Sequence, residues 1–312
     1  MNRVPVALVF PGQGTQKQGM GEPWRETASW ALTEEISAAT GEDLAELLLR
    51  TPTEQLRRTD LAQLTVFTVA VMAHAEAVRA GSLGPVVACA GHSLGEYAAL
   101  TAAGALGVRR AAELVAVRGR AMREAALARE GTMGVLVAAP LDQVDALVAE
   151  VRAEGADVWV ANVNAPGQTV VSGSPEGVAA TGERAASIGG RMLRLDVGGA
   201  FHSPLMAPAA EALGRELGRT DFAPAHRPVV ANVDAAPHTD GRVWPRLGVQ
   251  QLTAPVRWEE SVRTLRRMGC RRLVELGPGR TLAGLARRID PGLETVSVDG
   301  PAALLVPPAA GR

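Results

Sequence analysis

The sequence predicts an α/β protein whose parallel sheet carries a smaller inserted subdomain. Short β-branched runs alternate with longer helical segments, a pattern typical of parallel strands buried under helices. In the middle of the chain the order of elements changes to βαββαβ. A chain of 312 residues that is 47% hydrophobic and 21% charged can bury a large core and an insertion. We therefore expect a large α/β subdomain (1–130 and 197–300), a small subdomain (131–196) and a flexible tail (301–312).

The N-terminal part supplies the first strands and helices of the large subdomain. Residues 4–10 and 86–90 are short apolar runs rich in β-branched residues, which predicts buried parallel strands. Helix-forming composition predicts helices over 24–39, 61–80 and 94–126. The segment 61–80 is apolar nearly all round, so we expect it to be buried against the sheet.

The segment 133–195 predicts the small subdomain. A strand-like "MGVLVA" precedes a helical "DQVDALVAEVRAEG", and "DVWVANV" and "TVVSG" flank a turn at "NAPGQ". A helical "PEGVAATGERAASIG" then leads to a last strand, "RMLRLDV". This βαββαβ order is the ferredoxin-like arrangement, and it predicts a compact unit inserted into the larger body.

The C-terminal part returns to the large subdomain. Its patterns predict a helix over 203–217, strands over 228–233 and 272–276, and a last helix over 281–288. The "GPGR" turn before that helix is typical of a helix cap. The tail "GPAALLVPPAAGR" is rich in Pro, Gly and Ala without a helical or strand period, so we exclude it from the fold.

Composition and charge exclude several function classes. The 32 basic and 33 acidic residues are mixed along the chain and give a formal charge of -1, so no long-range field favours nucleic acid or an anionic membrane. The two cysteines, Cys89 and Cys270, lie in or beside apolar runs, which favours reduced thiols in a core. No signal-peptide pattern and no uncharged apolar run of about 18 residues occurs. We expect a cytoplasmic monomer that neither is secreted nor spans a membrane.

The most informative stretch is "VVACAGHSLGEYAAL", in which a strand meets Gly91-His92-Ser93-Leu94-Gly95 and a helix follows at once. Small residues on both sides of Ser93 allow a tight turn that exposes its hydroxyl, the G-x-S-x-G arrangement of an α/β-hydrolase-like body. Backbone N–H groups at the helix start would lie near an oxyanion. The alternative is a glycine-rich structural turn, but the flanking strand and helix favour a nucleophile.

A serine nucleophile needs a base, and the sequence offers five histidines. His74 lies in the apolar helix, where a satisfied core residue is expected. His92 adjoins the serine on the tight turn and would point away from it, which favours a supporting role. His226 and His238 lie in Pro- and Asp-rich polar stretches typical of surface loops. His202, in "DVGGAFHSPLM", follows a strand and a flexible Gly-Gly and precedes a helix, so it is the best candidate base.

One arginine lies on the apolar face of a predicted helix. Arg118 shares this stripe at helical spacing, whereas Arg109, Arg120 and Arg123 fall away from it. The apolar members of the stripe are Ala111, Leu114, Val115, Met122 and Ala125. Because an unpaired buried charge is costly, Arg118 needs either an internal carboxylate or an anionic ligand. The pattern alone leaves these two alternatives open.

Seven motifs carry a family resemblance in a single order along residues 4 to about 290. They are "VFPGQGTQKQGMG", "GHSLGEYAAL", "VRGRAM", "NVNAPGQTVVSG", "GAFHSPLM", "QLTAPVRW" and "VELGPGRTL". Together they resemble the malonyl-CoA:acyl carrier protein transacylases and the related acyltransferases of polyketide synthases, including those that act in trans. The resemblance implies an enzyme of fatty acid or polyketide biosynthesis.

The resemblance implies a ping-pong reaction. Ser93 would be acylated by a malonyl-type thioester of coenzyme A, with His202 as general base for attack and general acid for thiol departure. The acyl group would then pass to the phosphopantetheine thiol of an acyl carrier protein. Arg118 matches the arginine that holds the free malonyl carboxylate, for which a bidentate ion pair suits a guanidinium. The resemblance implies no metal and no cofactor of the protein's own.

Further site residues follow only from the resemblance. Gln13 matches the oxyanion-hole glutamine, whose backbone N–H would work beside that of Leu94. Gln251 matches the residue whose main-chain carbonyl orients the histidine in place of a triad carboxylate. Asn162 and Asn164 lie in the family's "NxN" segment near the coenzyme A entrance.

The preferred acyl group follows less directly. Phe201 and Met122 are expected to line the acyl pocket, and the "AFH" sequence at Phe201 and a branched residue at Leu94 accompany malonyl units in related polyketide domains. Gly199 stands where those domains usually have His, so that code applies only in part. A pocket difference of one methylene is worth only ~1–3 kcal/mol. The sequence therefore leaves open whether the enzyme prefers malonyl, methylmalonyl or larger units. It also leaves open the pathway and the carrier protein.

Two other functions compete with the transferase. A serine thioesterase or hydrolase of the α/β-hydrolase type shares G-x-S-x-G, but it requires an acid between Ser and His and usually an HGGG-like oxyanion loop, neither of which is evident. It also leaves Arg118 without a task. A docking module without catalysis would explain the small subdomain but would leave Ser93, His202 and Arg118 coincidental.

Overall fold

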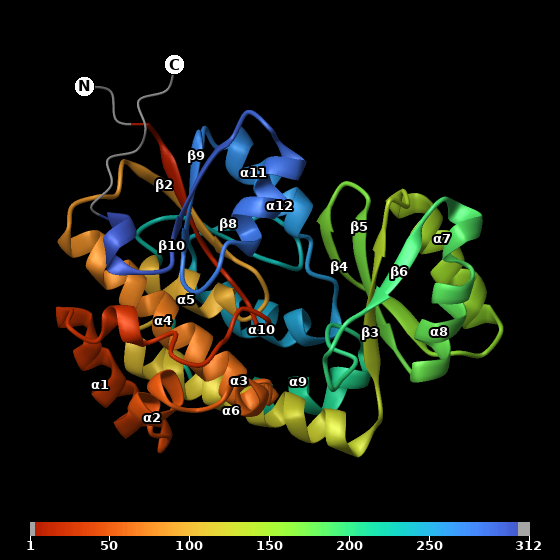
Figure 1. Cartoon of the computed structure of the whole chain (residues 1–312), viewed down its shortest axis with the longest axis horizontal. Coiled ribbons are helices and arrows are strands. Elements are labelled where there is room, and N and C mark those ends of the chain that lie inside the picture. Colours follow the sequence, from red (N-terminus) through yellow and green to blue (C-terminus); the bar gives the residue numbers. More distant parts are fainter. Residues whose placement is uncertain (1–3, 305–312) are drawn as a thin grey trace.

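The computed structural model describes residues 4–304 and has a mixed α/β fold with two sheets (Figure 1). The larger sheet has six strands in the order β10-β9-β1-β2-β7-β8. Pairing is parallel from β10 through β7, and β8 runs antiparallel to β7 at one edge. The strands are β1 (Val6–Phe10), β2 (Val86–Gly91), β7 (Val229–Val230), β8 (Pro237–His238), β9 (Arg272–Leu276) and β10 (Glu294–Val298).

Helices cover both faces of this sheet because alternate strand residues are apolar on each side. Val6, Leu8 and Phe10 of β1 point into one core, whereas Ala7 and Val9 point into the other. The first face packs α1 (Ala31–Thr40), α2 (Leu44–Leu49), α3 (Thr53–Leu56), α4 (Thr59–Arg79), α5 (Gly95–Ala102), α6 (Val108–Ala128), α9 (Ala207–Leu217) and α10 (Trp244–Thr253). The second face packs α11 (Trp258–Arg267) and α12 (Thr281–Ile289).

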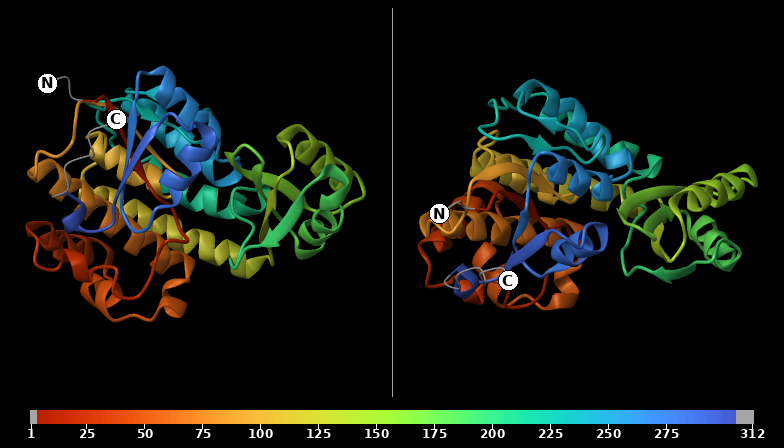
Figure 2. Two further views of the ribbon diagram at one scale, coloured as in Figure 1. Left: turned by 45° about the horizontal axis from the view of Figure 1, so that its top comes forward. Right: turned by 90° about the horizontal axis from the view of Figure 1, so that it is seen from above.

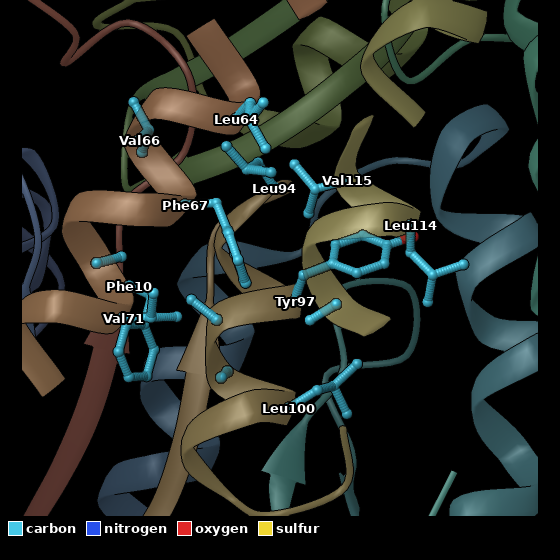
Figure 3. Packing of buried hydrophobic residues seen from close by; sticks show 14 of the residues in the cluster. Phe10, Leu64, Val66, Phe67, Val71, Leu94, Tyr97, Leu100, Leu114 and Val115 are labelled. Atoms are coloured by element: carbon cyan, nitrogen blue, oxygen red, sulfur yellow. The ribbon is translucent and has the colours of Figure 1, made fainter. Parts of the chain in front are cut away.

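The helix α4 is the centre of the first core, as its apolar sequence predicts. By length and composition it is the one helix among the described residues that could cross a membrane, but 78% of its most apolar window is buried inside the protein. Figure 3 shows side chains of α4, α5 and α6 pointing into a shared core, among them Phe67, Tyr97 and Leu114. We therefore regard α4 as a core helix.

The second sheet forms a separate unit that projects from one end of the larger one (Figure 2). Its strands are antiparallel in the order β4-β5-β3-β6 and, with two helices, they follow the predicted βαββαβ order. A separate apolar cluster fills the space between this sheet and its helices. The elements are β3 (Thr132–Val137), α7 (Leu141–Ala153), β4 (Val158–Ala165), β5 (Gln168–Gly173), α8 (Pro175–Glu183) and β6 (Arg191–Arg194).

Several predicted elements differ in extent from the structure. The helix predicted over 94–126 is two helices, because Gly104 adopts a left-handed backbone (φ 78°) between α5 and α6. The helix predicted over 24–39 begins only at Ala31, after two 3₁₀ turns separated near Thr27, whose backbone is extended. The strand predicted over 228–233 pairs only at Val229–Val230.

Other elements carry no clear signal in the sequence. The patterns do not predict α2, α3, α10, α11, β8 or β10. At the start of the expected tail, Pro301–Leu304 form a 3₁₀ turn in which Ala303 and Leu304 pack against the first core. The rest of that tail, residues 305–312, lies outside the described residues.

Candidate active site

A cavity of about 300 Å³ lies beside the carboxyl ends of β1 and β2. It is lined by the loop that follows β1, by Ser93, Arg118 and His202 from the large subdomain, and by Asn162 and Asn164 from β4 of the small one. Ligands of parallel α/β sheets commonly bind outside the carboxyl ends of the strands. The cavity thus brings together most of the residues that the sequence singled out.

The turn at Ser93 depends on the two glycines that flank it. A Cβ on Gly91 would lie 1.9 Å from the carbonyl carbon of Gly95, and a Cβ on Gly95 would lie 2.1 Å from the carbonyl oxygen of Phe10. Ser93 itself has a left-handed backbone (φ 51°), which is strained for a residue with a side chain. Close packing against β1 therefore allows the sharp turn that presents the hydroxyl to the cavity.

Ser93 and His202 form a direct hydrogen bond. The distance between Ser93 Oγ and His202 Nε2 is 2.7 Å, and His202 Nδ1 lies 2.8 Å from the main-chain oxygen of Gln251. Because a carbonyl oxygen only accepts, Nδ1 carries the ring proton and Nε2 presents its lone pair to the serine hydroxyl. Burial and the nearby charge of Arg118 lower the pKa of His202 to about 3. The imidazole is therefore neutral and can accept a proton.

Arg118 is buried on the face of α6 that its apolar stripe predicts. Its guanidinium donates to Gln63 Oε1 at 2.6 Å, to Gln251 Oε1 at 3.0 Å and to Ser93 Oγ at 3.0 Å. Among residues 4–304 it forms no ion pair with a carboxylate, since Glu96 acts on it only at longer range, and its Nε has no hydrogen-bond partner there. The internal salt bridge that the sequence left open is therefore not formed between described residues.

Electrostatics around Arg118 favour an incoming anion. Burial lowers the pKa of the guanidinium, while Tyr97 and Glu96 oppose that shift. The guanidinium carbon lies 5.9 Å from the centre of the Tyr97 ring. A buried cation whose hydrogen bonds all go to neutral acceptors gains stability when a carboxylate displaces some of those acceptors.

Gln251 has more contacts than the resemblance implies. Besides its main-chain bond to His202, its side-chain Nε2 donates to the carbonyl oxygen of Ser93 at 3.0 Å, and its Oε1 accepts from Arg118. Gln251 is 1% exposed at the end of α10. One residue therefore contacts the serine, the histidine and the arginine.

The two backbone N–H groups expected to bind an oxyanion border the cavity. Gln13 lies in the loop after β1, and Leu94 is the N-cap of α5. Neither N–H donates to another group within the described part of the chain. Free N–H groups at a helix start are suited to stabilise a negative oxygen. The arrangement can therefore accept developing charge beside Ser93.

The other four histidines do not contact the serine hydroxyl in the described structure. The Nε2 of His92 lies 2.9 Å from Asn164 Oδ1, in line with a supporting role. His74 packs edge-on against Phe10, and burial lowers its pKa. His226 is exposed, and His238 pairs with Asp234.

Residues expected around the acyl group and the entrance also line the cavity. Phe201 and Met122 are buried there, and the Met122 sulfur accepts from Gln63 Nε2 at 3.3 Å. Asn162 is buried on β4, and Asn164 borders the cavity beside His92. Of residues 4–304, no group of three or more His, Cys, Asp or Glu side chains is arranged to hold a metal ion.

Sequence reasoning missed three polar residues at this site. Gln63 is a buried polar side chain in an apolar helix, a signal that the sequence contains but that we did not use. Asn232 and Glu96 are also buried, and both contact the turn or its neighbours. Glu96 lies in the motif "GHSLGEYAAL", but the sequence pattern does not show which polar group either residue contacts, so only the fold places them here.

A neutral histidine bonded to a serine at a strand–helix turn, beside a buried guanidinium, defines a class of serine-dependent acyl-transfer enzymes. The model of the acyl transferase domain family matches residues 7–307. The malonyl CoA-acyl carrier protein transacylase of Bacillus subtilis (strain 168) is 38% identical over 299 residues, which cover 95% of this chain and 94% of that protein. The chain belongs to the acyl transferase family, among its malonyl CoA-acyl carrier protein transacylases.

Two further relatives connect the chain to polyketide biosynthesis. The polyketide biosynthesis malonyl CoA-acyl carrier protein transacylase PksC of Bacillus subtilis (strain 168) is 35% identical over 297 residues, covering 93% of this chain and 99% of that protein. A solved complex of a type II polyketide synthase acyl carrier protein with its malonyl-transacylase is 36% identical and has a TM-score of 0.91. It covers 96% of this chain and 98% of that one.

Proposed function

We propose that this protein transfers a malonyl group from coenzyme A to the phosphopantetheine thiol of an acyl carrier protein. The observation that carries the proposal is Arg118, a buried guanidinium without a carboxylate partner in residues 4–304, 3.0 Å from Ser93 Oγ. An acyl group esterified to Ser93 would place a free carboxylate within reach of this cation only if the acyl chain is short. The family and the names of the relatives agree with a malonyl group.

The chemistry follows from the serine and the histidine. Ser93 Oγ attacks the thioester carbonyl carbon while its proton moves to His202 Nε2. The tetrahedral intermediate collapses, the carbon–sulfur bond breaks, and His202 returns the proton to the departing coenzyme A thiolate. The carrier protein's thiol then attacks the malonyl-serine ester by the reverse path, which completes a ping-pong cycle.

Three groups support these steps. The N–H groups of Gln13 and Leu94 stabilise the oxyanion, a contribution of about 10²–10³-fold for one such donor in other acyl-transfer enzymes. The main-chain oxygen of Gln251 accepts from His202 Nδ1 and fixes the tautomer, the role that a carboxylate has in a triad. In the acyl-enzyme, the malonyl carboxylate takes the place of a neutral acceptor on Arg118.

The cavity walls set the choice of acyl group and the approach of the thioester. Phe201 and Met122 border the malonyl α-carbon, and we expect them to disfavour a methyl substituent by ~1–3 kcal/mol. Asn162 and Asn164 contact the pantetheine arm at the entrance. Relatives of both pathways match over nearly the full chain, so both fatty acid and type II polyketide carrier proteins are candidate acceptors.

We also propose the finer description of the fold. The β3–α7–β4–β5–α8–β6 order and the strand order β4-β5-β3-β6 support a ferredoxin-like subdomain at 131–196. The serine turn between β2 and α5 supports an α/β-hydrolase-like body built from 1–130 and 197–300. We expect the enzyme to be cytoplasmic and to need no cofactor beyond the substrate's coenzyme A and the carrier's phosphopantetheine.

Intact-mass measurement after incubation with malonyl-CoA tests the proposal. The wild-type protein should gain one malonyl group, lose it when holo acyl carrier protein is added, and yield malonyl carrier protein. Ser93→Ala should gain none. Free malonate released without a labelled enzyme or a labelled carrier would instead identify a hydrolase, and no reaction with malonyl-CoA would overturn the proposal.

A further inference from the structure

The side chain of Asn232 holds the backbone at the serine turn. Its Oδ1 accepts from the N–H of Ser93 at 2.7 Å, and its Nδ2 donates to the carbonyl oxygen of Gly91 at 2.7 Å. The residue is 1% exposed and lies two positions after the end of β7. One amide therefore binds a donor and an acceptor on the same short segment.

This contact continues the pairing between β2 and β7 after the strand itself has ended. The last backbone partners of these strands are Ala90 and Val230. Beyond them the chain leaves the sheet, and the carboxamide of Asn232, which has one acceptor and one donor side, bonds to β2 as a peptide group would. One bond needs an acceptor and the other needs a donor, so together they determine which side-chain amide atom is the oxygen and which is the nitrogen.

Glu96 fixes Asn232 in turn. The Oε2 of Glu96 accepts from the backbone N–H of Asn232 at 2.8 Å, and the carbonyl of Asn232 accepts from the N–H of Arg257 at 2.9 Å. Glu96 is 3% exposed in the first turn of α5, directly after the serine turn. The backbone N–H and the backbone carbonyl of Asn232 are therefore both hydrogen-bonded, which fixes the position from which its side chain extends.

The strained backbone of Ser93 needs such restraint. Ser93 lies before α5, and the first N–H groups of a helix have no acceptor within it, so the N–H of Ser93 needs a partner from elsewhere. Asn232 binds that N–H, while the Gln251 side chain binds the Ser93 carbonyl. A strained backbone conformation persists where several surrounding contacts hold it in place.

We propose that Asn232 is a positioning residue that, held by Glu96, sets the backbone of Ser93 so that its hydroxyl reaches His202. It also occupies the N–H of Ser93, which leaves the N–H of Leu94 as the donor from this turn to an oxyanion. The inference rests on Ser93 being the acylated residue. Misplacement of a reacting atom by about 1 Å can cost about 10²-fold in rate.

Asn232→Asp and Asn232→Ala provide the main test. In Asn232→Asp, an ionised carboxylate still accepts from the N–H of Ser93, but its second oxygen faces the carbonyl oxygen of Gly91 and repels it. A protonated carboxyl can donate to that carbonyl oxygen, as the amide does. Burial raises the pKa of such a carboxyl, and the carboxylates of Glu96 and Asp234 act in the same direction. The Arg118 cation acts against them, and the His202 ring is neutral. The loss in Asn232→Asp should therefore be smaller at low pH than at high pH, measured against wild type at each pH.

The readout is the rate of Ser93 acylation by malonyl-CoA, together with Ser93 labelling by a fluorophosphonate. Asn232→Ala should lower kcat for loading about 10²-fold with little change in KM, and should show no recovery at low pH. The fluorophosphonate rate should fall in parallel. Wild-type protein that reacts with the fluorophosphonate but not with malonyl-CoA would refute the proposed function while leaving this inference testable.

Two controls separate positioning from folding. Thr264→Val removes the buried bond from Thr264 Oγ1 to the Ala235 carbonyl in the same loop, and it should lower Tm without lowering either rate. Glu96→Ala should lose more activity than Glu96→Gln, which keeps an acceptor for the Asn232 N–H. Equal rates in those two variants, wild-type rates in both Asn232 variants, or a pH-independent deficit in Asn232→Asp would each overturn the inference.

Discussion

The two sides of the cavity differ in how firmly their side chains are held. On the large-subdomain side, Ser93 is hydrogen-bonded to both His202 and Arg118, and Gln251 contacts all three. On the small-subdomain side, Asn164 reaches the serine turn through a bond to His92. Under the proposed function, the first side would perform the chemistry and the second would shape access to it.

The attachment of the small subdomain agrees with this division. Its strand β4 pairs with the large subdomain through a bridge between Asn162 and Val256, and Arg288 of α12 donates to the Pro166 carbonyl. Its outer strand β6 is largely exposed. Residues of β3 and β5, among them Met133 and Val170, also pack into the first core cluster. Because Ser93, His202 and Arg118 all lie on the other side, variants on the two sides should affect different kinetic constants.

The largest effect expected on the large-subdomain side is that of His202→Ala. Removing the base should lower the rate of Ser93 loading by about 10³-fold, since general base catalysis contributes about 10²–10⁴-fold. Single-turnover loading with malonyl-CoA measures it. His226→Ala, which removes an exposed histidine, serves as the control and should keep the wild-type rate. Loading at the wild-type rate in His202→Ala would mean that another group accepts the serine proton.

Arg118→Ala should have the next largest effect, and a selective one. Malonyl loading should fall about 10²-fold more than acetyl loading, because only the malonyl group carries a carboxylate for the guanidinium. The measurement is the ratio of the two loading rates, which cancels any general damage to the cavity. Arg120→Ala, two residues along the same helix and exposed, is the matched control. Equal losses for both acyl groups would exclude the carboxylate contact.

The sequence predicted the residues that local patterns place, and missed those that only the tertiary fold places. Ser93 follows from a strand, a tight turn and a helix in immediate succession, and the burial of Arg118 follows from helical spacing. The pattern places Asn232 in a strand because it follows the apolar run of β7. The strand ends earlier because the Asn232 side chain, and not its backbone, pairs with β2.

The same distinction explains the errors in the helices. The apolar helix α4 is continuous and was predicted well, whereas the helix predicted over 94–126 is interrupted where Gly104 turns the chain. Helices α10 and α11 present mixed polar and apolar sequence, and their packing against neighbours decides their conformation. Gln251 at the end of α10 was named by resemblance, but its three-way contact depends on how that helix packs.

Buried and exposed carboxylates of the two subdomains should respond differently to pH. Burial raises the pKa of Glu96 to about 7 from an ordinary value of 4.5. Since the folded protein then binds more protons than the unfolded one between these values, the Glu96 contribution to stability should fall as pH rises from about 4.5 to about 7. Unfolding free energies of wild type and Glu96→Gln should therefore change relative to each other by about 2–3 kcal/mol over that range.

Glu154 of the small subdomain is the matched comparison. Its exposed pair with Arg184 lowers the pKa of Glu154, so its contribution is present above the ordinary pKa and is lost as pH falls. Glu154→Gln should show a small difference of the opposite sign. Parallel pH curves for the Glu96→Gln and wild-type proteins would show that Glu96 titrates normally and would weaken the contrast between the two sides.

The smallest effect is expected for Asn164→Ala on the small-subdomain side. This change removes one wall hydrogen bond, to His92, without touching Ser93, His202 or Arg118. It also removes the expected contact of Asn164 with the pantetheine arm. Such a hydrogen bond is worth about 0.5–1.5 kcal/mol, so KM for malonyl-CoA should rise by about 3–10-fold with kcat within about twofold. Arg191→Ala on the exposed strand β6 is the control and should change neither constant. A fall in kcat at constant KM would contradict the proposed difference between the two sides of the cavity. It would show that the small subdomain supports the serine turn itself through His92.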